Sequence, residues 1–170
     1  HFARPIRNIL ALYGSKLVKF EIAGVKSTKT TLPMLSFGAK PAKINEPQDY
    51  IPTLKNLEQP ILADIKERKQ TLIKALNSVA AKLGYQADLD EDLINETISF
   101  TEHPVVLSGD MDIKFLKLPK ELITTVLKKQ LRMFPVVDKQ GNLQPHFIAV
   151  RDGISVNQDE VRHGFKNVMT

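Results

Sequence analysis

A group of basic side chains in residues 114–132 is the feature of this sequence best suited to bind a ligand. Lysine and arginine neutralise phosphate, and several of them on one surface can follow a nucleic-acid backbone. The structural alternative is that basic residues at a helix end stabilise its last carbonyl groups. Arg4 and Arg7 are two further candidates, which would share one face if they lie on a helix. The basic group consists of Lys114, Lys117, Lys120, Lys128, Lys129 and Arg132.

Charge is separated along the chain, whose formal net charge is +5. Residues 1–45 contain eight Lys or Arg and the single acid Glu21. Residues 86–113 contain eight acids and no Lys or Arg, whereas residues 114–139 contain seven bases and two acids. The basic blocks could meet phosphate, or the acidic and basic blocks could be complementary surfaces that partly neutralise each other. Charge alone leaves both interpretations open.

Other residue types with possible chemistry form no convincing site. Asp88, Asp90 and Asp92 alternate as in a calcium loop, but the sixth position has no glycine and the twelfth no glutamate. We therefore interpret them as helix-capping and solvated acids. The four histidines lie far apart, and no phosphate loop or nucleophile elbow is present. We expect no catalytic residue and no metal ligand, with Thr124-Thr125 bonded back to its own helix.

The basic group should be positioned by a helix that begins at Leu118-Pro119 and ends near Arg132. Proline suits the first helical position, and Glu121 in the first turn matches the helix dipole. Spacing of apolar residues predicts a buried stripe on this helix. The stripe is Leu122, Val126 and Leu131, with Ile123 and Leu127 alongside.

Two strands should follow this helix. Phe134, Val136 and Val137 predict the first strand, and Phe147, Ile148 and Val150 predict the second. Residues 138–142 form the loop between them, with Gly141 at its left-handed position.

The rest of the chain alternates expected helices and strands. We expect a helix, or a strand leading into a helix, in residues 2–12, a turn at 13–15 and a strand over 17–22. Further helices should begin at Asn45, occupy residues 61–83 before Gly84, and begin at Asp90. A strand is expected at residues 104–107 and a loop at 108–112. The predicted fold class is α+β, an antiparallel-rich sheet with three or four packed helices, in a single domain of residues 1–170.

Composition narrows the protein class. Hydrophobic residues make up 42% of the chain and charged residues 25%, which is ordinary for a globular domain. No run of about eighteen apolar residues is present, so we expect no membrane partner. The lack of cysteine excludes disulfides and fits a cytoplasmic protein. The pattern of residues 161–170 stops inside a helix-like segment, and we expect the sequence to be part of a longer chain.

Residues 115–152 resemble the central part of the bacterial glycyl-tRNA synthetase beta subunit. The family has an FL-LP-E-LITT helix, an R-(aromatic)-FPV strand and a D-x-x-G-x-L-x-P-x-FI-V hairpin. This chain matches them in order without gaps, except that Met133 stands at the aromatic position. Near the N-terminus, Arg4, Pro5, Ile6 and Gly14 match a second family segment. One departure follows Thr30-Thr31, where the family's Gly-His-Arg-Phe is replaced by LPMLSFGAK. Gln130, Leu131 and Met133 also depart from the family's histidine, glutamine and tyrosine.

The resemblance implies a fold similar to the B3/B4 module of the phenylalanyl enzyme. It further implies a parent enzyme that ligates glycine to tRNA(Gly) with ATP and magnesium in an alpha2-beta2 assembly. Adenylate chemistry belongs to the alpha subunit in that family, so this fragment should need no cofactor and be inactive alone. Its partners would be tRNA(Gly), the alpha subunit and the remaining domains of the beta subunit. Two alternatives are a purely structural interaction module and an editing-type aminoacyl-tRNA hydrolase.

Overall fold

The computed structural model describes residues 6–32, 40–58 and 60–153. Its chain divides into two compact units, His1–Ala63 (unit 1) and Asp64–Thr170 (unit 2), each of which is described by itself. A single domain over residues 1–170 stays a prediction. The described residues are helices and mainly antiparallel sheets, so the predicted α+β class is confirmed.

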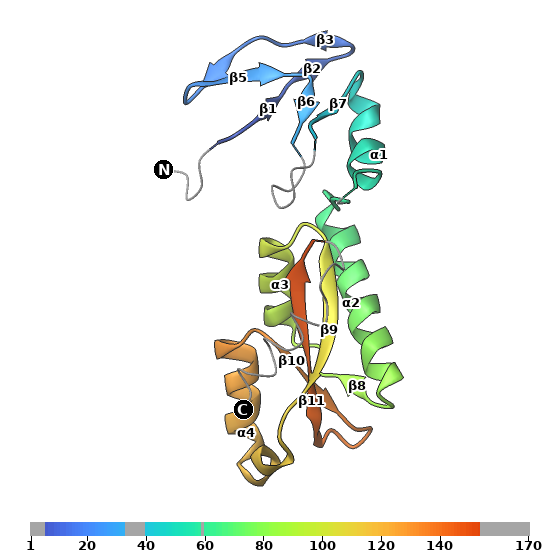
Figure 1. Cartoon of the computed structure of the whole chain (residues 1–170), viewed down its shortest axis with the longest axis vertical. Coiled ribbons are helices and arrows are strands. Elements are labelled where there is room, and N and C mark those ends of the chain that lie inside the picture. Colours follow the sequence, from blue (N-terminus) through green and yellow to red (C-terminus); the bar gives the residue numbers. More distant parts are fainter. Residues whose placement is uncertain (1–5, 33–39, 59, 154–170) are drawn as a thin grey trace. The chain divides into compact units, whose positions relative to one another are not determined.

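In its described residues, unit 1 consists of short strands followed by helix α1 (Figure 1). β1 and β5 pair in parallel, with Ile9 opposite Ser27, whereas the other strand pairs are antiparallel. Gly14, at a φ of 56°, makes the tight turn between β2 and β3 as predicted. The strands are β1 (Ile9–Leu10), β2 (Leu12–Tyr13), β3 (Lys16–Leu17), β4 (Glu21–Ile22), β5 (Val25–Thr28), β6 (Thr30–Thr31) and β7 (Ala42–Lys43).

The N-terminal segment is not helical in its described part. A helix in residues 2–12 was one expectation, but β1 and β2 occupy residues 9–10 and 12–13. The main-chain bonds of β1 go to β5, a partner distant in sequence that apolar spacing cannot reveal. The strand expected over residues 17–22 is likewise split into β3 and β4.

The helix of unit 1 begins one residue later than expected. Glu46, rather than Asn45, precedes η1 (Pro47–Asp49), which leads into α1 (Tyr50–Lys55). The Asp49 carboxylate accepts the Glu46 backbone N–H at 3.1 Å, which satisfies a donor at the helix start. Leu54 of α1 is buried.

Unit 2 contains an antiparallel sheet with the strand order β8-β10-β11-β9. The hairpin predicted from residues 134–150 is confirmed, with Phe134 opposite Ile148 and Gly141 at a φ of 82° in its loop. β9 continues through residues 108–110, where a loop was expected, because these residues pair with β11. The strands are β8 (Gln86–Ala87), β9 (Pro104–Asp110), β10 (Phe134–Val137) and β11 (Leu143–Asp152).

Helices α2 (Ile65–Lys82) and α3 (Glu91–Phe100) pack against the sheet in one core. Asp64 and Asp90 cap their N-termini, and Gly84 follows α2 at a φ of 82°, as expected of a helix stop. α2 begins at Ile65 rather than at residue 61 as expected, and Ile65 itself is exposed at the first position of the helix. This core contains Leu72, Leu76, Ala80, Leu93, Ile94, Ile98, Phe134, Val136 and Ile148.

A second core lies under the helix that carries the basic group. This helix is preceded by η2 (Ile113–Lys117) and consists of α4 (Lys120–Thr125) and a π-helical turn, η3 (Val126–Gln130). Successive residues of a strand point to opposite faces, so Phe147 joins this core while Ile148 joins the other. The second core contains Met111, Ile123, Leu127, Met133, Phe147 and Ala149.

The predicted stripe of this helix is confirmed at Ile123, Leu127 and Leu131, which pack in the second core, but it was wrong at Leu122 and Val126. Leu122 and Val126, expected inside, are 51% and 39% exposed, whereas Ile123 and Leu127 are 6% and 0% exposed. Both sets recur at four-residue spacing, so periodicity could not choose between them. Packing against Phe147 of the sheet and against Met133, which precedes β10, buries Ile123 and Leu127 instead.

Candidate nucleic-acid interface

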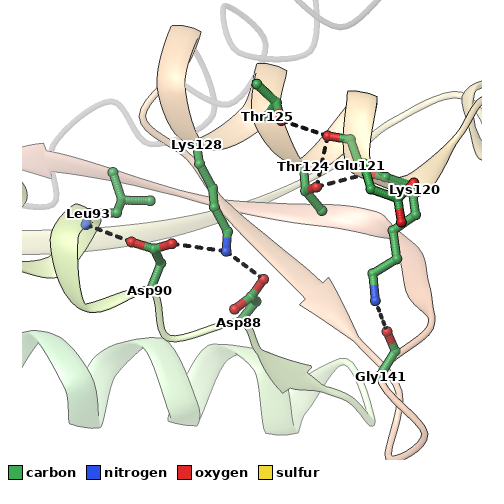
Figure 2. Close-up of polar contacts among 9 residues, drawn as sticks. All are labelled: Asp88, Asp90, Leu93, Lys120, Glu121, Thr124, Thr125, Lys128 and Gly141. Atoms are coloured by element: carbon green, nitrogen blue, oxygen red, sulfur yellow. Dashed lines mark hydrogen bonds and ion pairs between the residues drawn. The ribbon is translucent and has the colours of Figure 1, made fainter.

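Lys128, a member of the basic group, points its Nζ toward two carboxylates of unit 2 rather than into solvent. Its Nζ lies 2.8 Å from an Asp88 carboxylate oxygen and 3.1 Å from Asp90 Oδ2 (Figure 2). The Lys128 side chain is 19% exposed. These contacts join η3 to the connection between β8 and α3, so Lys128 links two segments of unit 2.

Asp90 has two functions in this cluster. Its Oδ1 accepts the backbone N–H of Leu93 at 3.0 Å and so caps α3, while its Oδ2 faces Lys128 (Figure 2). The Leu93 N–H and then Lys128 stabilise the charged carboxylate and lower the pKa of Asp90, although partial burial opposes them. Burial is the largest influence on Lys128 and favours its neutral form, yet the bonds and charges of Asp88 and Asp90 together raise its pKa. Asp90 and Lys128 are therefore both fully ionised at neutral pH.

Arg132 is engaged with an acid as well. Its backbone has a φ of 52°, in the left-handed region, where the chain leaves η3 for β10. Its Nε donates to Glu96 Oε1 of α3 at 2.6 Å, in a largely exposed pair.

Lys114 lies in η2, before α4, and Lys120 is the first residue of α4. Lys114 pairs with Asp112 at 3.0 Å and lies over the Phe115 ring, 5.4 Å from its centroid. Lys120 donates to the Gly141 carbonyl in the hairpin loop (Figure 2). Both side chains contact neighbouring elements of the same unit.

Lys117 and Lys129 are the members of the basic group that remain open to a ligand. Both residues are exposed, and neither side chain makes an ion pair or hydrogen bond with a described residue. They lie at the end of η2 and within η3, on either side of α4. Arg7 is exposed but not helical, and Arg4 lies outside the described residues, so their expected shared helix face is absent from the described part. Contact of the eight candidates with tRNA stays a prediction.

The sequence showed the acids that pair with the basic group only as an acidic segment, without the individual ion pairs. Acids of residues 86–113 meet bases of residues 114–139 at Asp88, Asp90 and Glu96, as the complementary-surface interpretation proposed. The specific pairs require the packing of α3 against the sheet, which no sequence spacing encodes. Asp90 as a helix cap was predicted correctly.

The threonine pair and the metal candidates show no reactive arrangement. Thr124 Oγ1 donates to the Lys120 carbonyl at 2.9 Å and Thr125 Oγ1 to the Glu121 carbonyl at 2.7 Å, the back-bonding that was predicted (Figure 2). Within residues 6–32, 40–58 and 60–153, no group of three or more acidic or histidine side chains could hold a metal ion. In the same residues, no helix has the length and apolarity to cross a membrane.

An apolar surface lies between the two open lysines. Leu122 and Val126, which we call the α4 ridge, lie four residues apart in the helical segment and are 51% and 39% exposed, while Leu118, 45% exposed, precedes the helix in extended backbone. Residues at this spacing share one side of a helix. The exposed apolar pair is therefore flanked in sequence by two exposed lysines.

Comparison with known proteins gives one consistent result. The family described as Glycyl-tRNA synthetase beta subunit matches residues 1–170. The chain is 38% identical over 168 residues to the Glycine--tRNA ligase beta subunit of Listeria monocytogenes serotype 4b (strain CLIP80459). It is 37% identical to the beta subunits of the same name from Dictyoglomus turgidum and Clostridioides difficile. Each match covers 99% of this chain and 24% of the relative, so the chain spans about a quarter of their length.

Proposed function

The chain belongs to the glycyl-tRNA synthetase beta subunit family, and we propose that it is a tRNA-contacting and supporting region of a glycine–tRNA ligase. The whole enzyme would join glycine to tRNA(Gly) with ATP and magnesium in the cytoplasm. Its adenylate step would belong to the alpha subunit, and this region would contribute binding and support.

The observation that carries the tRNA contact is the exposure of Lys117 and Lys129 on either side of α4. Two exposed cations on one segment can each neutralise a phosphate and release counterions. Lys128 and Arg132 are less suited to this task because their charges already face carboxylates. The proposal therefore concentrates on two residues of the basic group.

A salt titration tests this contact. Replacing Lys117 and Lys129 together by Ala should weaken tRNA(Gly) binding and flatten its dependence on salt by about 1.5 in the log–log slope, or roughly 0.7–0.9 per lost phosphate contact. The matched control replaces Lys74 and Lys82, two exposed lysines of α2, and should change the slope less. Equal slopes for both double variants would contradict the proposed contact surface.

A second candidate function is that of a structural interaction module, and the α4 ridge favours it. Large apolar side chains on one exposed helix face usually pack against another protein surface. The relatives are about four times as long as this chain, so we propose that another part of the same beta subunit covers the ridge. In the full-length subunit, Leu122→Asp should lower the midpoint of thermal unfolding, while the same change at exposed Ile113 should have little effect. Equal midpoints for the two variants would exclude this candidate.

A further inference from the structure

Unit 1 contains a hollow that belongs to none of the surfaces described above. Its volume is about 620 Å³, within the usual range for small-molecule sites. All of the described residues around it fall between Arg7 and Tyr50 and so belong to unit 1. They include Arg7, Leu10, Thr31, Ile44, Pro47 and Tyr50.

Hydrogen bonds and burial fix the walls of this hollow. The Asn8 side-chain amide donates to the Thr30 carbonyl at 2.8 Å and so ties the segment before β1 to β6. Ile44 is fully buried, and its backbone N–H donates to the Lys29 carbonyl at 2.8 Å. These contacts hold the floor in place without a ligand, which reduces the ordering cost of binding.

The side chains around the hollow combine one cation, one aromatic ring and an aliphatic floor. Arg7 is the charged residue among the described lining residues, and none of those residues is acidic. Tyr50, at the first position of α1, supplies the ring, and Leu10 and Ile44 supply apolar surface. Such a set accepts a flat, largely apolar group that is attached to an anion.

We propose that this hollow binds one unpaired nucleotide of an RNA strand. Its base would lie against Tyr50 and the aliphatic floor, and Arg7 would pair with its phosphate. Stacking on an aromatic side chain is how proteins commonly hold unpaired bases. This inference rests on the proposed tRNA contact, but it uses different residues in the other unit.

The net positive charge of unit 1 favours a nucleotide within an RNA strand over a free nucleotide. Unit 1 carries nine Lys or Arg against four Asp or Glu, two of which, Glu46 and Asp49, stand next to Pro47 and Tyr50 in sequence. This excess of positive charge would attract the phosphates on both sides of the bound nucleotide. A free nucleotide would gain less from it because it lacks the flanking phosphates.

The test uses the full 170-residue chain and a single-stranded pentaribonucleotide with 2-aminopurine at its centre. Tyr50→Ala should weaken binding by about 5- to 150-fold, the equivalent of one lost stacking contact. Tyr50→Phe keeps the ring and should bind within about threefold of the parent chain. Tyr13→Ala is the matched control, since Tyr13 is an exposed tyrosine of unit 1 that does not line the hollow.

Arg7 is tested in parallel. Arg7→Gln should weaken binding and flatten the salt dependence, whereas Arg7→Lys should keep the slope because it keeps the charge. Lys16→Gln, at an exposed position in β3, controls for the general loss of one charge in unit 1. Free AMP is the comparison ligand and should bind much more weakly than the pentamer.

Three results would overturn the inference. Equal losses for Tyr50→Ala and Tyr13→Ala, or for Arg7→Gln and Lys16→Gln, would show that the hollow is not the contact. AMP binding as tightly as the pentamer would indicate a site for free nucleotides instead of RNA. If tRNA binding responds to Lys117 and Lys129 but not to Arg7 or Tyr50, the proposed function stands while this inference fails. Circular dichroism spectra of Tyr50→Phe and Tyr50→Ala show whether a variant has lost its fold or only its stacking contact with the base.

Discussion

The two helical sides of the unit 2 sheet differ in how completely their apolar residues are covered. On one side, α2 and α3 bury a continuous core that includes Leu72, Leu76 and Ile94. On the other, α4 and η3 bury Ile123 and Leu127 but leave the α4 ridge exposed. One face of the sheet is thus covered by helices whose apolar residues are buried, and the other by a helical segment that leaves apolar residues exposed.

Length explains much of this difference. α2 has 18 residues, so its apolar stripe is averaged over five turns and only its first residue, Ile65, departs. α4 has six residues before the π-helical turn begins, and the adjacent pair Leu122-Ile123 offers two faces about 100° apart. A short helix with two apolar faces buries one of them and presents the other.

The largest expected effect is at Phe147, which lies in the core under α4. Phe147→Ala should lower the free energy of unfolding by about 3–5 kcal/mol, because it removes a fully buried ring and leaves a cavity. Urea unfolding of the chain measures the change. A loss below about 1 kcal/mol would mean that the α4 side contributes little to stability.

A pair of substitutions tests the orientation of α4 itself. Leu127→Ala should cost about 2–5 kcal/mol, because this side chain is fully buried, while Leu122→Ala should cost less than about 1 kcal/mol. Both variants remove the same atoms from one helical segment, so each is the control of the other. Reversed costs would place Leu122, rather than Leu127, in the core.

Removal of Lys128 should disturb folding more than RNA binding. Lys128→Met keeps the aliphatic stem but leaves Asp88 and Asp90 without their cation, at a cost of about 1–2 kcal/mol because all three groups are partly exposed. Lys129→Met at the neighbouring exposed position should change stability by less than about 0.5 kcal/mol. Chemical unfolding and tRNA titration of both variants separate the two roles, and a tRNA-affinity loss for Lys128→Met alone would contradict this assignment.

The smallest effect is the pH dependence of the Asp90 cap. Because the folded pKa of Asp90 is lowered, its charge stabilises the fold above the ordinary unfolded pKa of about 3.9, and this contribution disappears as the pH falls through the lowered value. Asp90→Asn keeps a capping oxygen but loses the charge. Its stability deficit should be about 1 kcal/mol or less at pH 7 and should vanish in acid. A deficit that is constant between pH 7 and pH 3 would exclude a role for the charge.

Local features of the fold were readable from the sequence. The strand over residues 134–137, the loop with Gly141 and the cap at Asp90 all depend on a few neighbouring residues. Each reflects a backbone preference or a hydrogen bond within one turn, which residue type alone can specify. The ordered motifs of residues 115–152 likewise indicated the family that the comparisons show.

Tertiary packing determined the contacts between segments that are distant in sequence. It paired Ile9 with Ser27 in a parallel ladder, turned Leu122 outward and directed Lys128 to Asp88 and Asp90. In each case the sequence allowed two arrangements of similar local energy, and long-range packing selected one. Local propensities differ by tenths of a kcal/mol per residue, whereas burying one large side chain contributes several times more, so packing prevails.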